Sequence, residues 1–379
     1  MSIAQTLLRS RAAAALTAPH GVDRYLEQIN PMWAAHEVRA RIVSIERETH
    51  ALDDPAPVAT ITLQPTSTWR GHRAGQHVQL GVEIGRGVGG ARRTTRAFSV
   101  SSAESGPGER FTITVRANPE GTVSKHLVHD AMPGEIVHLS QAQGDFTVTP
   151  DRGDPVPMRL VMVTGGSGIT PALSMVRTLL RQRYPGRVSF VHFAQSPDHQ
   201  IAADELAAIS AADNGVDVHL VHGELFTAER LEALVPDHRS VRAWACGPAA
   251  MIELVQEAYD DLTVDGTPAD RGGEPLLAVE YFKTPVLDTA DAEGTVSFSQ
   301  SSGAPGAEGE NTGATLLEQA EALGLSPQYG CRMGICFSCV ATKSSGTVRD
   351  VVSGETSAAP DEDIRICISQ PVGSCQVQL

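Results

Sequence analysis

Four cysteines in the C-terminal part of the chain constrain it more than any other feature. Cys331, Cys336 and Cys339 follow the spacing C-x4-C-x2-C, and Cys367 comes after 27 further residues. Three thiolates on one tight loop and a fourth from a separate strand form the plant-type ligand pattern of a [2Fe–2S] cluster. Gly334 within the loop lets the backbone approach the inorganic core. The spacing therefore predicts a metal centre that moves single electrons.

Two other uses of these cysteines fit the pattern less well. A structural zinc site usually shows two short C-x2-C pairs. Disulfides are disfavoured by the uneven clustering of the cysteines and by the absence of a secretory signal. Five of the six cysteines lie from Cys331 onward; the sixth is Cys246, and Cys375 has no assigned role. Free thiols beside a cluster indicate the cytoplasm.

The length and the net charge of the chain limit the number of domains and the kind of partner it can bind. A chain of 379 residues suffices for two or three domains. It has no apolar run of roughly eighteen residues, so we expect no transmembrane segment. The formal net charge of −15 argues against a nucleic-acid partner. It suits an electron carrier that docks on a basic surface of an acceptor protein, since residues 293–379 hold ten acidic and four basic side chains.

The N-terminal residues 1–36 read as one or two amphipathic helices. Packing of this extension on the first domain is the preferred interpretation. Its arginines and alanines also fit a transit peptide. As a further alternative, the extension would lie peripherally on a membrane beside a membrane-bound partner.

Residues 37–152 carry the period-two pattern of β-strands. Val78, Leu80 and Val82 alternate with polar or small residues, and so do Phe111 and Ile113. Short alternating segments separated by Gly- and Pro-rich turns predict an antiparallel β-barrel.

Residues 153–283 change to buried strands that alternate with helices. The stretch RLVMVTGGSGITPALSMVRTLLRQR joins an apolar strand, a glycine turn and a helix of period 3.6. VSFVHFAQ, VDVHLVHG and VRAWACGP predict further buried strands, and LLAVEYF returns to the sheet. This alternation predicts an α/β domain with a doubly wound parallel sheet.

A linker over residues 284–292 leads into a third domain, residues 293–379. There TVSFSQ predicts a strand, SSGAPGAEGENTG a low-complexity loop, and ATLLEQAEALGL an amphipathic helix that leads into the cysteine loop.

A single-electron centre needs a converter if its donor is a nicotinamide, which gives a hydride, and a flavin is that converter. The barrel should therefore bind flavin. Arg96, Ala97, Phe98 and Ser99 offer a guanidinium for a phosphate, a ring for stacking and a hydroxyl for flavin N5. In isolation the same tetrapeptide is an ordinary barrel strand.

A second segment of the barrel suits the phosphates of the same cofactor. Gly121, Thr122, Val123 and Ser124 open a predicted helix whose backbone N–H groups would meet a pyrophosphate. Its position after the first segment, and ahead of a nucleotide-binding fold, strengthens both predictions.

The glycine turn of the α/β domain is the candidate nicotinamide-nucleotide site. It lacks the GK[ST] of a loop that binds ATP for hydrolysis, and it departs from the dinucleotide-binding fingerprint G-x-G-x-x-G. The alternative is an ordinary glycine turn, which any α/β protein has at this position. Cys246, Gly247 and Pro248 end another strand at the same edge, although a lone cysteine also suits a small buried position. The residues of the turn are Gly165, Gly166, Ser167, Gly168, Ile169, Thr170 and Pro171.

The order RAFS, GTVS, GGSGITP, CGP and cysteine tail resembles the ferredoxin–NADP reductase superfamily, from about Val38 to the C-terminus. More narrowly, it resembles reductases with a C-terminal [2Fe–2S] domain that feed oxygenases and desaturases. The resemblance implies a flavin barrel, a nicotinamide-nucleotide sheet and an α+β ferredoxin-like β-grasp domain. It also implies an NAD(P)H-dependent oxidoreductase that passes electrons from the flavin to the cluster and on to an acceptor.

The resemblance also assigns residues. The family's Glu-x-Phe near the flavin matches Glu280 and Phe282, and its C-G-P matches the segment that begins at Cys246. It implies that Ser99, Glu280 and Cys246 lie at the reacting atoms. FAD is implied rather than FMN, although an FMN branch with the same domain order exists.

The segments DRYLEQINPMW, GQHVQLGVEI, AQGDF and CRMGIC resemble actinobacterial reductases of membrane fatty-acid desaturases or alkane hydroxylases. That subgroup suggests NADPH. However, no Lys or Arg occurs between Arg187 and Arg230, where a 2′-phosphate would need one, so these residues favour NADH. Both donors stay open.

Two other functions compete with this one. The first is the reductase of a soluble aromatic-ring oxygenase or haem monooxygenase. The second is an iron–sulfur redox sensor without enzymatic activity, which would use the α/β domain only to bind a nucleotide.

Overall fold

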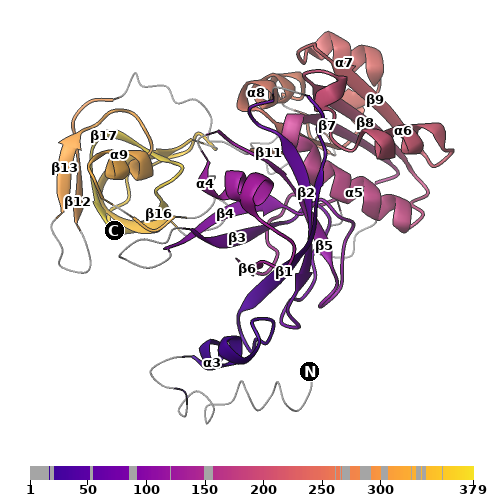
Figure 1. The fold of residues 1–379 in the computed structure, drawn as a ribbon. Coiled ribbons are helices and arrows are strands. Elements are labelled where there is room, and N and C mark those ends of the chain that lie inside the picture. The colour runs from indigo at the N-terminus through magenta and orange to yellow at the C-terminus, as the bar shows by residue number, and fades with distance from the viewer. Residues whose placement is uncertain are drawn as a thin grey trace. The chain divides into compact units, whose positions relative to one another are not determined.

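The computed structural model (Figure 1) contains two units, Met1–Glu280 and Tyr281–Leu379. The predicted domain limits stay predictions, and within the predicted linker only Ala292 is described. The structure describes residues 17, 21–51, 54–84, 92–119, 121–148, 157–260, 262–264, 266, 274–281, 292–299, 306–325, 327–329, 334, 339–351 and 353–379.

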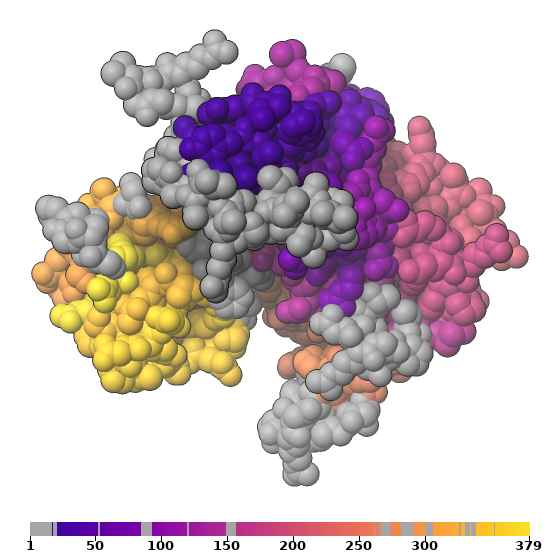
Figure 2. Space-filling view, turned by 90° about the horizontal axis from the view of Figure 1, so that it is seen from below, coloured from indigo at the N-terminus to yellow at the C-terminus, as the bar shows by residue number. Residues whose placement is uncertain are grey.

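Of the predicted N-terminal extension, helix α3 (Val22–Ile29) is described, whereas residues 1–16 and 18–20 lie outside the described residues. The segment after α3 is fastened to the barrel by Arg39. Its buried guanidinium donates to the carbonyl oxygens of Pro31 at 2.9 Å and Trp33 at 2.6 Å. In Figure 2 the indigo atoms, which include this segment and the first barrel strand, lie against the purple atoms of later barrel strands.

The barrel is a six-stranded antiparallel sheet in the order β4-β3-β6-β1-β2-β5. An isolated bridge between Val100 and Ile113 joins the end of β4 to β5, so the sheet curls back on itself. Val78, Leu80 and Val82 are buried in its core, as the period-two pattern predicts. The strands are β1 (Val38–Arg47), β2 (Val58–Pro65), β3 (His77–Ile84), β4 (Arg92–Ser99), β5 (Phe111–Arg116) and β6 (Ile136–Leu139). Helix α4 (Thr122–Lys125) continues into a π-helical turn, His126–Asp130.

The second sheet of the first unit has the order β11-β10-β7-β8-β9, with parallel pairing of β10 to β7, β7 to β8 and β8 to β9. Helices α5 and α6 cover one face and α7 and α8 the other (Figure 1), which confirms the doubly wound fold. The strands are β7 (Arg159–Gly165), β8 (Arg187–Ala194), β9 (Val216–His222), β10 (Ala243–Gly247) and β11 (Leu277–Tyr281). The helices are α5 (Ile169–Arg181), α6 (Ala203–Ala211), α7 (Ala228–Leu234) and α8 (Ala249–Ala258).

The described residues of the second unit form a mixed sheet with helix α9 (Leu316–Ala322) packed on it. Its sheet has the order β13-β12-β17-β14-β15, and β16 pairs with β14. Thr315 and Glu318 form a reciprocal capping box that fixes the start of α9. The strands are β12 (Thr295–Ser299), β13 (Ala307–Glu310), β14 (Val340–Asp350), β15 (Thr356–Ser357), β16 (Glu362–Arg365) and β17 (Ser369–Gln378). This confirms the predicted α+β class.

One expectation for this unit is wrong. Residues 301–313 were expected to form a loop throughout, yet Ala307–Glu310 is a strand that pairs antiparallel with β12. The edge of β12 offers unpaired backbone groups, and satisfying them outweighs the low strand propensity of a short Gly- and Glu-rich segment.

Candidate active site

The glycine turn and the CGP segment lie side by side at the C-terminal edge of the parallel sheet. Thr164, just before the turn, faces Cys246 in the β7–β10 pairing. A Cβ atom on Gly168 would lie 2.3 Å from the carbonyl oxygen of Cys246, so only glycine allows this approach. Gly166 has φ +53°, a left-handed conformation that glycine adopts without strain.

This edge is also where the chain order of the sheet reverses. After β7 the chain continues to β8 on one side, and β10 lies on the other. Open sheets bind ligands at such a switch point. The 3-10 turn Gly166–Gly168 leads directly into α5, whose first residues Ile169, Thr170 and Pro171 are buried. Backbone N–H groups at the start of this helix suit a pyrophosphate.

The predicted flavin segment forms the end of β4. In the antiparallel pairing with β3, Phe98 faces Val78 and packs on the barrel core. Ala97 and Ser99 alternate with it on the other face. The Arg96 guanidinium donates to the Thr95 carbonyl at 2.8 Å.

The second predicted phosphate segment lies beside the first, since α4 packs against β4. Gly121 is the N-cap of α4, with Thr122 and Val123 in its first turn. The Ser124 hydroxyl accepts a hydrogen bond from the Asn118 backbone N–H at 3.1 Å, which fixes the entry into the helix.

A buried acid joins these two halves of the first unit. The Ser99 hydroxyl donates to the carboxyl of Glu280 at 3.4 Å, although the two residues are 181 positions apart. Burial raises the pKa of Glu280 to about 8, so the carboxyl keeps its proton at neutral pH. Burial, and secondarily the charge of Glu280, raises the pKa of the Cys246 thiol well above its usual value. The structure thus brings Ser99, Glu280 and Cys246 together, whereas Phe282 lies outside the described residues.

Two further polar side chains at this site were not predicted. On β3, His77 faces Ser99 and Gln79 faces Ala97. Both side chains are buried, and none of their nitrogen and oxygen atoms has a hydrogen-bond partner among the described residues. Burial lowers the pKa of His77 to about 4, so the ring is neutral. Unpaired buried groups beside the flavin segment fit a ligand with a polar edge, such as a flavin ring. The signal in the sequence was the polar pair His77 and Gln79, which alternates with the apolar Val78 and Leu80 in GQHVQLG.

In the second unit, Cys339 and Cys367 are buried with their sulfur atoms 3.0 Å apart and no disulfide between them. The Gly334 backbone N–H donates to the Cys367 sulfur at 3.3 Å. Converging thiols that also receive an N–H donor fit an iron–sulfur cluster, whose potential such hydrogen bonds tune. Cys331 and Cys336 lie outside the described residues. Accordingly, the described residues contain no group of three metal-ligating side chains.

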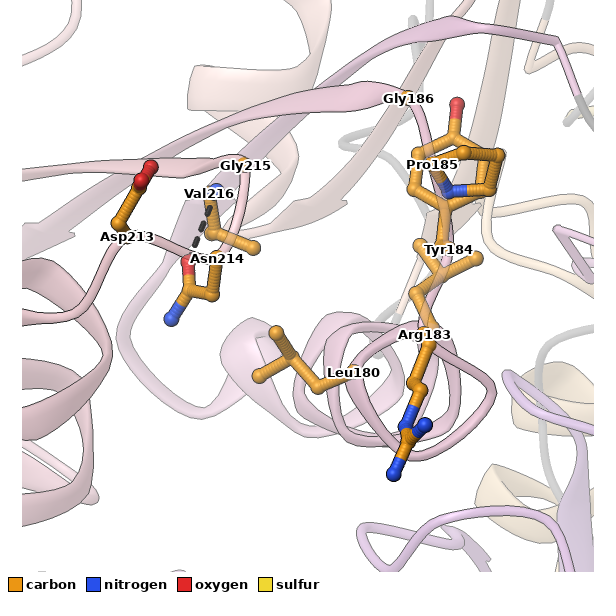
Figure 3. Close-up of a pocket in the computed structure, with 10 residues that line it drawn as sticks. Leu180, Arg183, Tyr184, Pro185, Gly186, Asp213, Asn214, Gly215 and Val216 are labelled. Atoms are coloured by element: carbon orange, nitrogen blue, oxygen red, sulfur yellow. Dashed lines mark hydrogen bonds between the residues drawn. The ribbon is translucent and has the colours of Figure 1, made fainter.

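A cavity of about 370 Å³ lies at the opposite edge of the parallel sheet. Figure 3 shows Arg183 and Tyr184 on one side of it and Asp213 and Asn214 on the other. These residues precede β8 and β9, at the N-terminal ends of the strands. The cavity is therefore separate from the switch point that carries the motifs.

Comparisons with known proteins agree with this arrangement. Residues 162–257 match the oxidoreductase NAD-binding domain family, and residues 305–377 match the 2Fe-2S iron-sulfur cluster binding domain family. The chain is 32% identical to an NADPH oxidoreductase of Mycobacterium tuberculosis, over 97% of this chain and 91% of that protein. It is 29% identical to a glycine betaine monooxygenase reductase subunit of Chromohalobacter salexigens, over 79% of this chain and 85% of that one.

A solved structure shares the fold. The structure of a phthalate dioxygenase reductase aligns with a TM-score of 0.56 at 20% identity, covering 90% of this chain and 97% of that chain. The chain belongs to the ferredoxin–NADP reductase superfamily, among the reductases with a C-terminal [2Fe–2S] domain. It is an NAD(P)H-dependent oxidoreductase whose parts serve a flavin, a nicotinamide nucleotide and an iron–sulfur cluster. The roles of the individual site residues stay predictions.

Proposed function

We propose that this protein oxidises NAD(P)H at FAD and passes the electrons singly through its cluster to a membrane fatty-acid desaturase or alkane hydroxylase. The observation that supports it most is the meeting of Ser99, Glu280 and Cys246 beside the glycine turn. When bound, the flavin supplies the exchange between hydride and single-electron chemistry.

The chain's own residues have separate tasks in this proposal. Backbone N–H groups of Gly166–Gly168 hold the pyrophosphate of the donor, and Cys246–Pro248 border its nicotinamide. Arg96 and the start of α4 hold the phosphates of FAD, and the unpaired polar atoms of His77 and Gln79 contact its ring. Cys331, Cys336, Cys339 and Cys367 ligate the cluster.

Glu280 holds a proton at the centre of the site. Because its pKa is about 8, the carboxyl is neutral at pH 7 and places no negative charge beside an incoming hydride. As an acceptor for the Ser99 hydroxyl it also fixes the orientation of that group.

The residues of the chain and its relatives favour different nicotinamide donors. The first arginine after the segment without Lys or Arg, Arg230, donates to the Glu224 carboxylate and to the Leu225 carbonyl, so its guanidinium is already engaged. This favours NADH, while the similarity to a protein named NADPH oxidoreductase favours NADPH.

An anaerobic absorbance titration with each nucleotide tests the electron path. Bleaching of the flavin bands followed by reduction of the cluster is the expected result, and the more effective nucleotide identifies the donor. Cluster absorption without any nucleotide-dependent bleaching would contradict the proposal and favour a redox sensor.

The acceptor requires a second experiment. In the described part of the chain no helix is both long and apolar enough to cross a membrane. The similarity to a glycine betaine monooxygenase reductase subunit supports a soluble oxygenase as the alternative. Turnover with desaturase-containing membranes, compared with turnover with purified soluble oxygenases, separates the two.

A further inference from the structure

Helix α5 has a polar stripe that is not part of the nucleotide-binding motif. The stripe consists of Ser174, Arg177, Thr178 and Arg181, whose spacing of three and four residues places them on one face of the helix. Ser174 and Thr178 are fully buried. Such residues are uncommon on the buried face of a helix unless each has a partner, so the stripe must serve a contact.

Every member of the stripe bonds to the segment Ser101–Glu104, which directly follows the flavin-binding end of β4. Ser174 donates to the Ser102 carbonyl at 2.6 Å, and Arg177 donates to the Ser101 carbonyl at 2.6 Å. The Thr178 hydroxyl accepts from the Glu104 backbone N–H at 2.8 Å. Arg181 donates to the Glu104 carbonyl.

Arg177 also reaches a third segment. Its guanidinium makes a bidentate pair with Glu205 of α6, at 2.9 Å from Nε and 2.5 Å from Nη2. The side chain is only 22% exposed, so the pair is partly shielded from water. One residue therefore ties α5, α6 and the barrel together.

The position of α5 gives these contacts a consequence for the reaction. The helix begins directly after the glycine turn, and its middle is bonded to the residues that follow Ser99. A helix is stiff along its axis, so it fixes the distance between the nucleotide-binding turn and the flavin segment. Hydride transfer is sensitive to that distance, because a 1 Å displacement costs about 100-fold in rate.

We propose that Arg177 is a positioning residue for hydride transfer, which sets the spacing between the nicotinamide and flavin sites through α5. The proposal rests on the proposed function, since it needs NAD(P)H to reduce a flavin held at Ser99. It assigns Arg177 no contact with either cofactor.

The chain offers a closely matched control in Arg159. Its guanidinium makes a bidentate pair with Asp237, at 3.0 Å from Nε and 3.0 Å from Nη2, and donates to the Leu160 carbonyl at 3.0 Å. Its side chain is 28% exposed. Arg159 thus shares with Arg177 a bidentate carboxylate and a carbonyl partner, and it also donates to the Ser189 hydroxyl at 3.0 Å. All of these partners belong to the parallel-sheet domain, whereas the carbonyl partner of Arg177 belongs to the segment that follows β4 of the barrel.

The test compares flavin-loaded Arg177→Met and Arg159→Met with the wild type. Anaerobic rapid mixing with NAD(P)H gives the limiting rate of flavin reduction and the dissociation constant of the nucleotide separately. We expect Arg177→Met to lower the rate 10- to 100-fold and to change the dissociation constant less than about threefold. Arg159→Met should change both less than about twofold. We also expect hydrogen exchange in residues 101–105 to become faster in Arg177→Met alone.

Two results would overturn the proposal. One is a wild-type rate of flavin reduction in Arg177→Met. The other is an equal loss of rate in both variants, which would trace the loss to general destabilisation. If Arg177→Met does not hold flavin, Ser174→Ala is tested in its place. We then expect faster hydrogen exchange in residues 101–105 and a several-fold slower reduction of the flavin. Wild-type exchange and a wild-type rate in Ser174→Ala would contradict the proposal. Failure of the wild type to react with either nucleotide would contradict the proposed function instead, whereas the exchange measurement would still show whether α5 holds the segment.

Discussion

Cys246 in the first unit and the pair Cys339 and Cys367 in the second are all buried thiols, yet their surroundings are opposite. Around Cys246, burial and the Glu280 carboxyl both disfavour the thiolate. Around Cys367, the Gly334 N–H points at the sulfur and a second thiol lies 3.0 Å away. A buried cysteine is therefore suited to line a binding site as an uncharged thiol in one unit and to ligate a metal in the other.

The difference shows what each half of the reaction requires. A hydride carries two electrons with a proton, and the site proposed for its transfer holds a protonated acid, Glu280, and a neutral thiol, Cys246. A cluster needs thiolates, and in the second unit the Gly334 N–H donates to the Cys367 sulfur, a contact that favours the thiolate form. Burial alone decides neither outcome, because the atoms that face the sulfur determine its charge.

The largest expected effect comes from removing a predicted ligand of the iron–sulfur cluster. Cys367→Ala removes one predicted ligand, so we expect loss of the cluster and a drop of more than about 100-fold in reduction of a protein acceptor. Flavin reduction by NAD(P)H should persist. Iron and acid-labile sulfide analysis, with acceptor and ferricyanide assays, measures both. Cys375→Ala removes another buried thiol of this unit and should leave the iron content unchanged. Wild-type iron in Cys367→Ala would contradict the ligand assignment.

A second prediction concerns Glu280, the buried acid of the first unit that is protonated at neutral pH. The folded-state pKa of Glu280 is about 8 against an ordinary 4.5, so between these values the folded protein holds a proton that the unfolded chain releases. The stability contributed at this site therefore falls as pH rises from about 4.5 to about 8, by on the order of a few kcal/mol. Glu280→Gln cannot titrate and should lack this decline.

Denaturant unfolding at a series of pH values, in flavin-free protein, measures the effect of Glu280→Gln. The advantage of the variant over the wild type should grow through this range and then level off. Glu253→Gln, at an exposed carboxylate of α8, is the control and should follow the wild type. A constant difference between Glu280→Gln and wild type at all pH values would show that Glu280 is ionised throughout.

The close contact between Cys246 and the glycine turn can be tested by its missing side chain. Gly168→Ala places a Cβ within 2.3 Å of the Cys246 carbonyl oxygen, so the turn must move. We expect a loss of about 1–3 kcal/mol in unfolding free energy and weaker nucleotide binding. Gly166→Ala meets no atom within 4 Å and has only its φ of +53° against it, so it should cost about 1–2 kcal/mol. Thermal unfolding and nucleotide titration compare the stability and the nucleotide affinity of the two variants. An equal loss of affinity in both would contradict a special role for the close contact between Gly168 and Cys246.

The smallest expected effect is the absence of a reaction. Because the thiolate of Cys246 is disfavoured, iodoacetamide at pH 8 should leave it unmodified in the folded protein and modify it fully after unfolding. Mass spectrometry of the peptide that contains Cys246 reads this out. Rapid modification of Cys246 in the folded protein would show that its thiolate is accessible and populated. It would then no longer differ from the cluster cysteines in the way described above.

The sequence alone determined the fold class and indicated which residues form the candidate site. Strand and helix periods are local properties, so the barrel pattern around Val78 and the strand–turn–helix at Gly165–Pro171 could be read directly. The order of the motifs then indicated a flavin and a nucleotide in one chain, and the cysteine spacing indicated the cluster.

Tertiary structure decided what no local pattern contains. It brought Ser99 to Glu280 across 181 positions, and it buried both faces of β3, so that His77 and Gln79 became unpaired polar groups beside the flavin segment. It made Ala307–Glu310 a strand because β12 offered an edge. It also joined the α5 stripe to Ser101–Glu104. Spacing and periodicity specify which backbone conformation a segment adopts, whereas the approach of distant segments depends on strand order and helix packing, which only the folded chain fixes.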